Sequence, residues 1–212
     1  MMSHGPAAPR AALADTQPSR LRRALLVTAL GLSVGAPALA RRYEGYDFAD
    51  RIQLDGASLQ LNGVGKRAVA IIRGYLAALY LGQTASTPEQ AYAVPGPKRI
   101  QIYMLLDVGA EEFVKAVDKG IARNCTEAEQ AALKEAQPAF IAQLRGVGKV
   151  KNRDLINMDY LPASGTQLSI NGRPAGPVVP GEVLYTALLK VFLGERPVDK
   201  RLKSGLLGGS PD

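Results

Sequence analysis

The sequence predicts an α+β domain built around a mainly antiparallel sheet. Segments with strand character come in runs and do not alternate singly with helical segments, which favours an α+β over an α/β fold. The C-terminal third shows this most clearly. Asn157 to Leu161 and Thr166 to Ile170 are expected as strands, and Asn171-Gly172 then supplies the two positive-φ residues that a tight hairpin turn needs.

Helical periodicity follows this hairpin. From Val183 to Phe192 apolar residues recur three and four positions apart, and Gly194 is expected to end the helix. A second short helix is expected from Val198 to Leu207, with Leu202 and Leu206 on one face.

The rest of the sheet is predicted from earlier segments. Apolar, β-branched and aromatic residues give strand character to five of them, and Gly63 and Gly65 are expected to form a turn after the second. These segments are Tyr43 to Leu54, Ser58 to Asn62, Val69 to Ile72, Tyr75 to Leu81 and Arg99 to Leu105.

Three further helices are expected before the hairpin. Thr87 followed by Pro88 is a helix start, and Ala110 to Asn124 has an amphipathic pattern. Thr126 opens a capping box for the third helix, which Pro138 is expected to kink or divide. Residues 146–151 are expected as a loop.

The first forty residues have the organisation of a secretory signal peptide. Three arginines between residues 20 and 23 precede an apolar run from Ala24 to Gly35, and small residues lead up to Ala40. The apolar run is shorter than the ~20 residues that span a bilayer. We therefore expect cleavage after Ala40 and an exported, periplasmic domain of residues 41–212 with no stable membrane span. An uncleaved anchor is the alternative.

The charge of the chain does not point to nucleic acid. The chain carries 26 basic and 19 acidic residues, a net charge of +7. The leader holds four of the basic residues and one of the acidic ones, so 22 basic against 18 acidic residues leave +4 for the mature domain. A thinly spread charge of this size is typical of an ordinary protein surface.

The composition also excludes several kinds of catalytic site. The only histidine, His4, belongs to the leader, which removes Ser-His-Asp and Cys-His catalysis and histidine-based metal sites. No acidic cluster has the spacing of a calcium loop, and Gly63-Val64-Gly65 lacks the rest of a phosphate-binding motif. The lone Cys125 cannot form an internal disulfide and is expected to be structural. We therefore expect neither a metal nor a cofactor.

Several motifs together resemble the chalcone isomerase-like superfamily, and in particular its bacterial exported branch. They are LQLNGVGKR at 59–67, YLAALYL at 75–81, the helix from Ala110, and the closing block NG…PGE…LGERPVDKRLKSGLL. The likeness covers Leu59 to Gly208. It implies an open-faced β-sandwich, in which a large antiparallel sheet is covered by a layer of helices with a ligand cleft between them.

The resemblance also implies where a site would lie. In the plant enzymes, an arginine, a threonine, a tyrosine and an asparagine assist the cyclisation of chalcone, and in fatty-acid-binding relatives an arginine and a tyrosine hold a carboxylate. Arg67 matches the arginine. The other positions carry Tyr75 for threonine, Phe113 for tyrosine and Gly120 for asparagine. A Ser/Thr position near the end of the penultimate helix carries Val191.

Loss of most of these hydrogen-bonding groups argues against flavanone-forming catalysis, because each would stabilise developing charge. We expect a non-catalytic module that binds a fatty acid or similar apolar anion, with Arg67 holding the anion. Tyr75, Tyr80, Phe113 and Val191 are the other candidate ligand contacts. The alternatives are an isomerase or intramolecular lyase that uses Arg67 and Tyr75 on an unsaturated or phenolic molecule, and a structural or partner-binding protein of the envelope.

Overall fold

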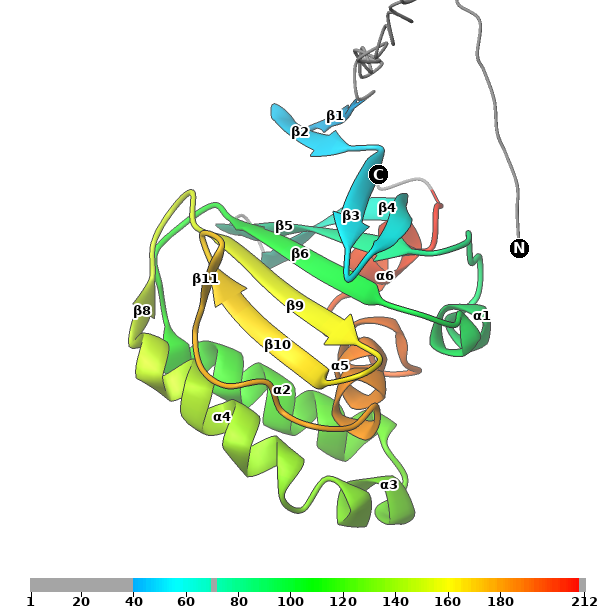
Figure 1. Cartoon of the computed structure of the whole chain (residues 1–212). Coiled ribbons are helices and arrows are strands. Elements are labelled where there is room, and N and C mark those ends of the chain that lie inside the picture. Colours follow the sequence, from blue (N-terminus) through cyan, green and yellow to red (C-terminus); the bar gives the residue numbers. More distant parts are fainter. Residues whose placement is uncertain (1–39, 70–71, 210–212) are drawn as a thin grey trace, which may run out of the picture. The chain divides into compact units, whose positions relative to one another are not determined.

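The structure, a computed structural model, describes residues 40–69 and 72–209 (Figure 1). It confirms the expected α+β architecture, with seven antiparallel strands in one sheet in the order β11-β10-β9-β6-β5-β4-β3. The expected signal peptide lies outside the described residues apart from Ala40, so the domain boundary stays a prediction. The strands of the sheet are β3 (Arg51–Leu54), β4 (Ala57–Val69), β5 (Ile72–Leu81), β6 (Lys98–Met104), β9 (Leu155–Leu161), β10 (Gly165–Ile170) and β11 (Arg173–Pro174).

Two short two-stranded sheets and a set of helices complete the described chain. One sheet is a hairpin of β1 (Ala40–Tyr43) and β2 (Tyr46–Ala49), and the other pairs β7 (Val108–Gly109) with the distant β8 (Lys149–Val150). The helices are α1 (Pro88–Ala93), α2 (Ala110–Asn124), α3 (Glu127–Ala132), α4 (Ala136–Val147), α5 (Val183–Leu193) and α6 (Lys200–Leu206). No helix in the described ranges is long and apolar enough to cross a bilayer.

Alternation along β5 separates two hydrophobic clusters. Tyr75, Ala77 and Leu79 belong to the main core, which includes the buried residues of α2, α4 and α5. The intervening residues, such as Tyr80, belong to a smaller cluster around Phe48 of β2. Because successive strand side chains point to opposite faces, the helices cover one face of the sheet, the inner face, and the smaller cluster lies on the other.

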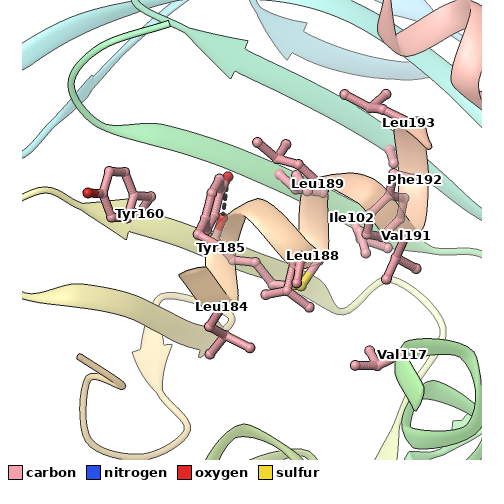
Figure 2. Packing of buried hydrophobic residues seen from close by; sticks show 14 of the residues in the cluster. Ile102, Val117, Tyr160, Leu184, Tyr185, Leu188, Leu189, Val191, Phe192 and Leu193 are labelled. Atoms are coloured by element: carbon pink, nitrogen blue, oxygen red, sulfur yellow. Dashed lines mark hydrogen bonds between the residues drawn. The ribbon is translucent and has the colours of Figure 1, made fainter. Parts of the chain in front are cut away.

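The inner face is closed mainly by α5, whose side chains point into the core (Figure 2). Leu184, Leu188 and Leu193 are fully buried there. Tyr185 is also buried, and its hydroxyl donates a hydrogen bond of 3.3 Å to the carbonyl oxygen of Met158 in β9. This bond satisfies the one polar atom that the Tyr185 ring brings into the core.

The local signals of the sequence are confirmed at several places. Asn171 and Gly172 have φ values of 51° and 77° and form the turn between β10 and β11. Thr87 and Thr126 each make a full capping box, at the starts of α1 and α3. The amphipathic helix α2 has the expected bounds.

Gly63 and Gly65 do not form the expected turn, because both lie within β4, whose pairing with β5 shifts register between Leu61 and Gly63. Helix α6 packs directly on the backbone of this strand. A Cβ on Gly63 would lie 2.0 Å from the carbonyl oxygen of Gly205, and one on Gly205 would lie 2.3 Å from that of Val64. The glycines therefore allow a helix and a strand to touch backbone to backbone, which a side chain would prevent.

The third predicted helix is divided into α3 and α4, as expected, and Pro138 lies in the first turn of α4, where a missing N–H is tolerated. Two other expected boundaries differ from the structure. Residues 146–151 are not simply a loop, since α4 runs to Val147 and β8 follows it. The last helix begins two residues later than expected because Asp199 caps it, accepting hydrogen bonds from the backbone N–H groups of Arg201 and Leu202.

A candidate ligand-binding cavity

A cavity of about 90 Å³ lies between the inner face of the sheet and the helices α2, α4 and α5. Its floor comes from five adjacent strands, β4, β5, β6, β9 and β10. The lining is almost wholly apolar, and its charged or phenolic members are Arg67, Tyr75 and Glu112. The apolar lining includes Ile102, Met104, Phe113, Ala116, Val117, Phe140, Leu144, Val147, Val150, Ile156, Met158, Leu168, Ile170, Val191, Phe192 and Val198. Apolar walls with a few polar groups are typical of small-molecule sites.

Arg67 brings a cation to one end of this cavity. It lies opposite Tyr75 in the β4–β5 pairing, and its guanidinium carbon is 5.7 Å from the centre of the Tyr75 ring. Its Nε is buried and has no hydrogen-bond partner, and within the described residues its guanidinium forms no ion pair. Buried polar groups normally find a partner, so an unsatisfied guanidinium nitrogen beside an apolar cavity is a candidate anion-binding group.

The Tyr75 hydroxyl is the second polar group at this end. Burial raises the pKa of Tyr75 well above its ordinary value; the positive charge of Arg67 opposes this rise, and the negative charge of Asp199 adds to it. The phenol is therefore protonated at neutral pH. It can donate a hydrogen bond to a ligand, and it is poorly suited to act as a base.

Part of the cavity lining is closer to solvent than the interior. Glu112 on the first turn of α2 is exposed, and its carboxylate is 2.8 Å from the Lys115 ammonium, also exposed. Phe113 and Val198 are half-buried, whereas Phe140 in the interior is completely buried. An ion pair as exposed as that of Glu112 contributes little to stability, so this carboxylate can move without cost to the fold.

Gly120 and Val191, two of the positions that matched polar groups of the plant enzymes, are packed against each other. Val191 of α5 is directed toward α2, where Val117 also lies (Figure 2). A Cβ on Gly120 would lie 2.7 Å from a methyl carbon of Val191. The space of an asparagine at position 120 is thus occupied by the Val191 side chain. The residue types at both positions suit an apolar contact and leave no hydrogen-bonding side chain there.

The structure brings together four of the five candidate ligand contacts. Arg67, Tyr75, Phe113 and Val191 all line the cavity. Tyr80 does not line it, because it follows Tyr75 by five positions, an odd interval, and so points to the other face of β5. This strand alternation was visible in the sequence and would have excluded Tyr80 from a site that contains Tyr75. A role of the four lining residues in binding stays a prediction.

Other wall residues were not identified from the sequence. Met104 and Met158 come from separate strands, and Val198 precedes α6. Their strand or helix periodicity places them in a core, but only the tertiary structure shows that this part of the core encloses a cavity. Among the described residues no group of three or more His, Cys, Asp or Glu side chains is placed to hold a metal ion.

Comparisons with known proteins agree with this architecture. The chalcone isomerase-like family model matches residues 40–208. The crystal structure of a fatty-acid binding protein from Arabidopsis thaliana is similar in fold, with a TM-score of 0.60 and 15% sequence identity over 80% of this chain and 96% of that chain. Curated proteins give no significant match. Because the family model covers most of the sequence, this chain belongs to the chalcone isomerase-like family.

Proposed function

We propose that this protein is a non-catalytic binder of a fatty acid or a similar apolar anion. The observation that carries the proposal is the unsatisfied Arg67 Nε at one end of an apolar cavity. A carboxylate placed there would accept charge-assisted hydrogen bonds from the guanidinium, which are stronger than bonds between neutral groups. The protonated Tyr75 hydroxyl is a second donor beside it, and the apolar walls suit an acyl chain.

The walls also argue against catalysis. Val191 and Gly120 pack together where the plant enzymes of the family would place hydrogen-bonding groups. Stabilising a developing negative charge requires donors aimed at it, and each donor is worth several kcal/mol of barrier. Within the described lining, Arg67 and Tyr75 are the two donors that remain at this end of the cavity.

The proposal includes export to the periplasm and membership of the bacterial exported branch of the family. Its support is the order of a basic cluster, a short apolar run and a small-residue cleavage site before residue 41. The mature chain would then carry its ligand in the compartment outside the inner membrane. The intact mass of the exported protein, which is expected to begin at Arg41, tests this part.

One alternative activity has a structural observation in its favour. Arg67 and Tyr75 are adjacent, with 5.7 Å between the guanidinium carbon and the ring centre, and could polarise one carbonyl group together. An isomerase or intramolecular lyase of an unsaturated or phenolic substrate would use them in this way. Turnover that is lost in both Arg67→Ala and Tyr75→Phe would favour this activity over simple binding.

The binding proposal is tested by mass spectrometry of organic extracts from the natively purified protein. We expect about one acyl species per protein molecule, and its loss in Arg67→Ala, because the variant lacks the anion-binding group. Arg51→Ala is the matched control, since Arg51 is an exposed arginine of β3 outside the cavity. The control should retain the ligand.

Delipidated protein provides the decisive second measurement. Titration with saturated fatty acids of 8 to 18 carbons should show saturable binding that Arg67→Ala weakens by about 10- to 100-fold, as expected for a hydrogen bond to a charged group. Absence of both an extracted acyl species and any saturable binding would overturn the proposal.

A further inference from the structure

The cavity has two ends that differ in chemistry. Arg67 lies on β4, and the opposite end is formed by Ile170 on β10 together with Val147 at the end of α4. Strands β5, β6 and β9 lie between β4 and β10, so the two ends are four strand spacings apart. At about 4.8 Å for each spacing, the backbones of β4 and β10 are about 19 Å apart along the sheet.

The far end is closed by a wall one side chain thick. Val147 and Ile170 line the cavity, and they also line a separate hollow on the surface beside it. That hollow is polar, with Lys149, Asn171 and Arg173 around it. Val147 and Ile170 are both half-buried, whereas Leu144 and Leu168 behind them are buried. The cavity thus ends where these two aliphatic side chains separate it from a solvent-exposed surface that carries Lys149 and Arg173.

We propose that Val147 and Ile170 limit the length of the bound acyl chain and make the protein selective for medium-chain acids of about 8 to 12 carbons. This inference rests on the proposed function, with the carboxylate at Arg67. Of the ~19 Å between the strands, a contact distance of about 4 Å is needed at each end, which leaves about 11 Å. An extended alkyl chain advances about 1.3 Å for each C–C bond of ~1.5 Å, so about nine bonds, or ten carbons, fit.

The small volume of the cavity agrees with a short chain. At about 90 Å³ it is well below the roughly 300–1,000 Å³ of typical ligand pockets. Met104 and Met158 on the floor are flexible side chains that can make room for a thin chain. A longer acid would have to push its terminal methyl group through the wall and into the mainly polar hollow, where Lys149, Asn171 and Arg173 offer it little apolar contact.

The test is a titration of delipidated wild-type protein with saturated acids of 8, 10, 12, 14, 16 and 18 carbons. Affinity is expected to rise about fourfold for each added carbon while the chain stays in the cavity, the factor that corresponds to ~0.8 kcal/mol per buried methylene. The rise should stop by 12 carbons. In Ile170→Ala the wall is opened, and the rise should continue to 16 carbons.

Two further variants keep this test decisive. Val147→Ala opens the same wall from α4 and replaces Ile170→Ala if that variant does not fold, as judged by circular dichroism. Ile52→Ala removes a half-buried isoleucine of β3 that does not line the cavity and should leave the chain-length profile unchanged.

The outcomes separate the two proposals. If the wild type binds no acid of any length, the proposed function fails. If the affinity of the wild type keeps rising about fourfold for each added carbon up to 16 and 18 carbons, fatty-acid binding stands and the length limit is overturned. The same conclusion follows if neither wall variant changes the chain-length profile.

Discussion

Replacement of Arg67 by methionine should stabilise the delipidated protein while weakening its ligand binding by about 10- to 100-fold. The buried Nε of Arg67 has no hydrogen-bond partner, and an unsatisfied buried donor costs about 1–3 kcal/mol. Methionine keeps an unbranched apolar stem and removes this donor. It also removes the contact with the Tyr75 ring, which at 5.7 Å is worth about 0.5–1 kcal/mol. The expected net gain is therefore about 1 kcal/mol.

For a domain of this size such a gain corresponds to a rise in Tm of about 2–4 °C. Thermal unfolding of the delipidated proteins at pH 7, followed by circular dichroism, measures it. Arg51→Met is the control, because Arg51 is exposed and its replacement relieves no buried donor. Added decanoate should raise the Tm of the wild type more than that of Arg67→Met, because the stabilisation by a ligand falls as its affinity for the folded state falls.

A Tm for delipidated Arg67→Met that equals or falls below that of the wild type, with Arg51→Met unchanged, would refute the reasoning. It would show that the guanidinium is already satisfied in solution, for example by water. The argument from an unpaired cation to an anionic ligand would then lose its basis.

Two other predictions concern stability. Gly205→Ala should destabilise the protein by about 1–3 kcal/mol or more, because its Cβ would lie 2.3 Å from the carbonyl oxygen of Val64. Ser204→Ala, on the exposed side of the same helix, should have little effect. Urea unfolding measures the free energy of unfolding of both variants. The Lys190 ammonium donates a hydrogen bond to Glu129 and holds the pKa of that carboxyl below its ordinary value. The pair therefore stabilises the fold at any pH above the ordinary pKa, and this contribution is lost as the pH falls through the lowered pKa. The Tm difference between the wild type and Glu129→Gln should therefore be present at pH 7 and shrink as the pH falls below about 4; a difference independent of pH would contradict this.

Local rules were sufficient for much of the fold. The capping threonines, the Asn171-Gly172 turn and the apolar stripe of α2 each act within a few residues, so the sequence shows them directly. The sheet as a whole followed from the order of strand-like segments together with the family resemblance. Alternation within β5 was equally visible, and applying it would have placed Tyr80 on the correct face.

The features that sequence reasoning missed depend on contacts between distant segments. Gly63 and Gly65 have the local signature of a turn, and only the approach of Gly205 reveals that they lie inside a strand. The packing of Val191 into the space beside Gly120 is likewise a property of two helices. The cavity belongs to this class, since its lining comes from the sheet and from several helices, and no short stretch of sequence encodes it.

The contact between β4 and α6 has a consequence for the order in which the site can be assembled. Asn62 donates a hydrogen bond of 2.7 Å to the carbonyl oxygen of Leu206, across 144 positions of the chain. The same strand carries Arg67, and Val198, just ahead of α6, lines the cavity. A contact of such sequence separation can form only after both segments have been synthesised. The end of the cavity that holds Arg67 is therefore incomplete until almost the entire chain has been synthesised, and a nascent chain that still lacks α6 would not yet have the proposed anion site.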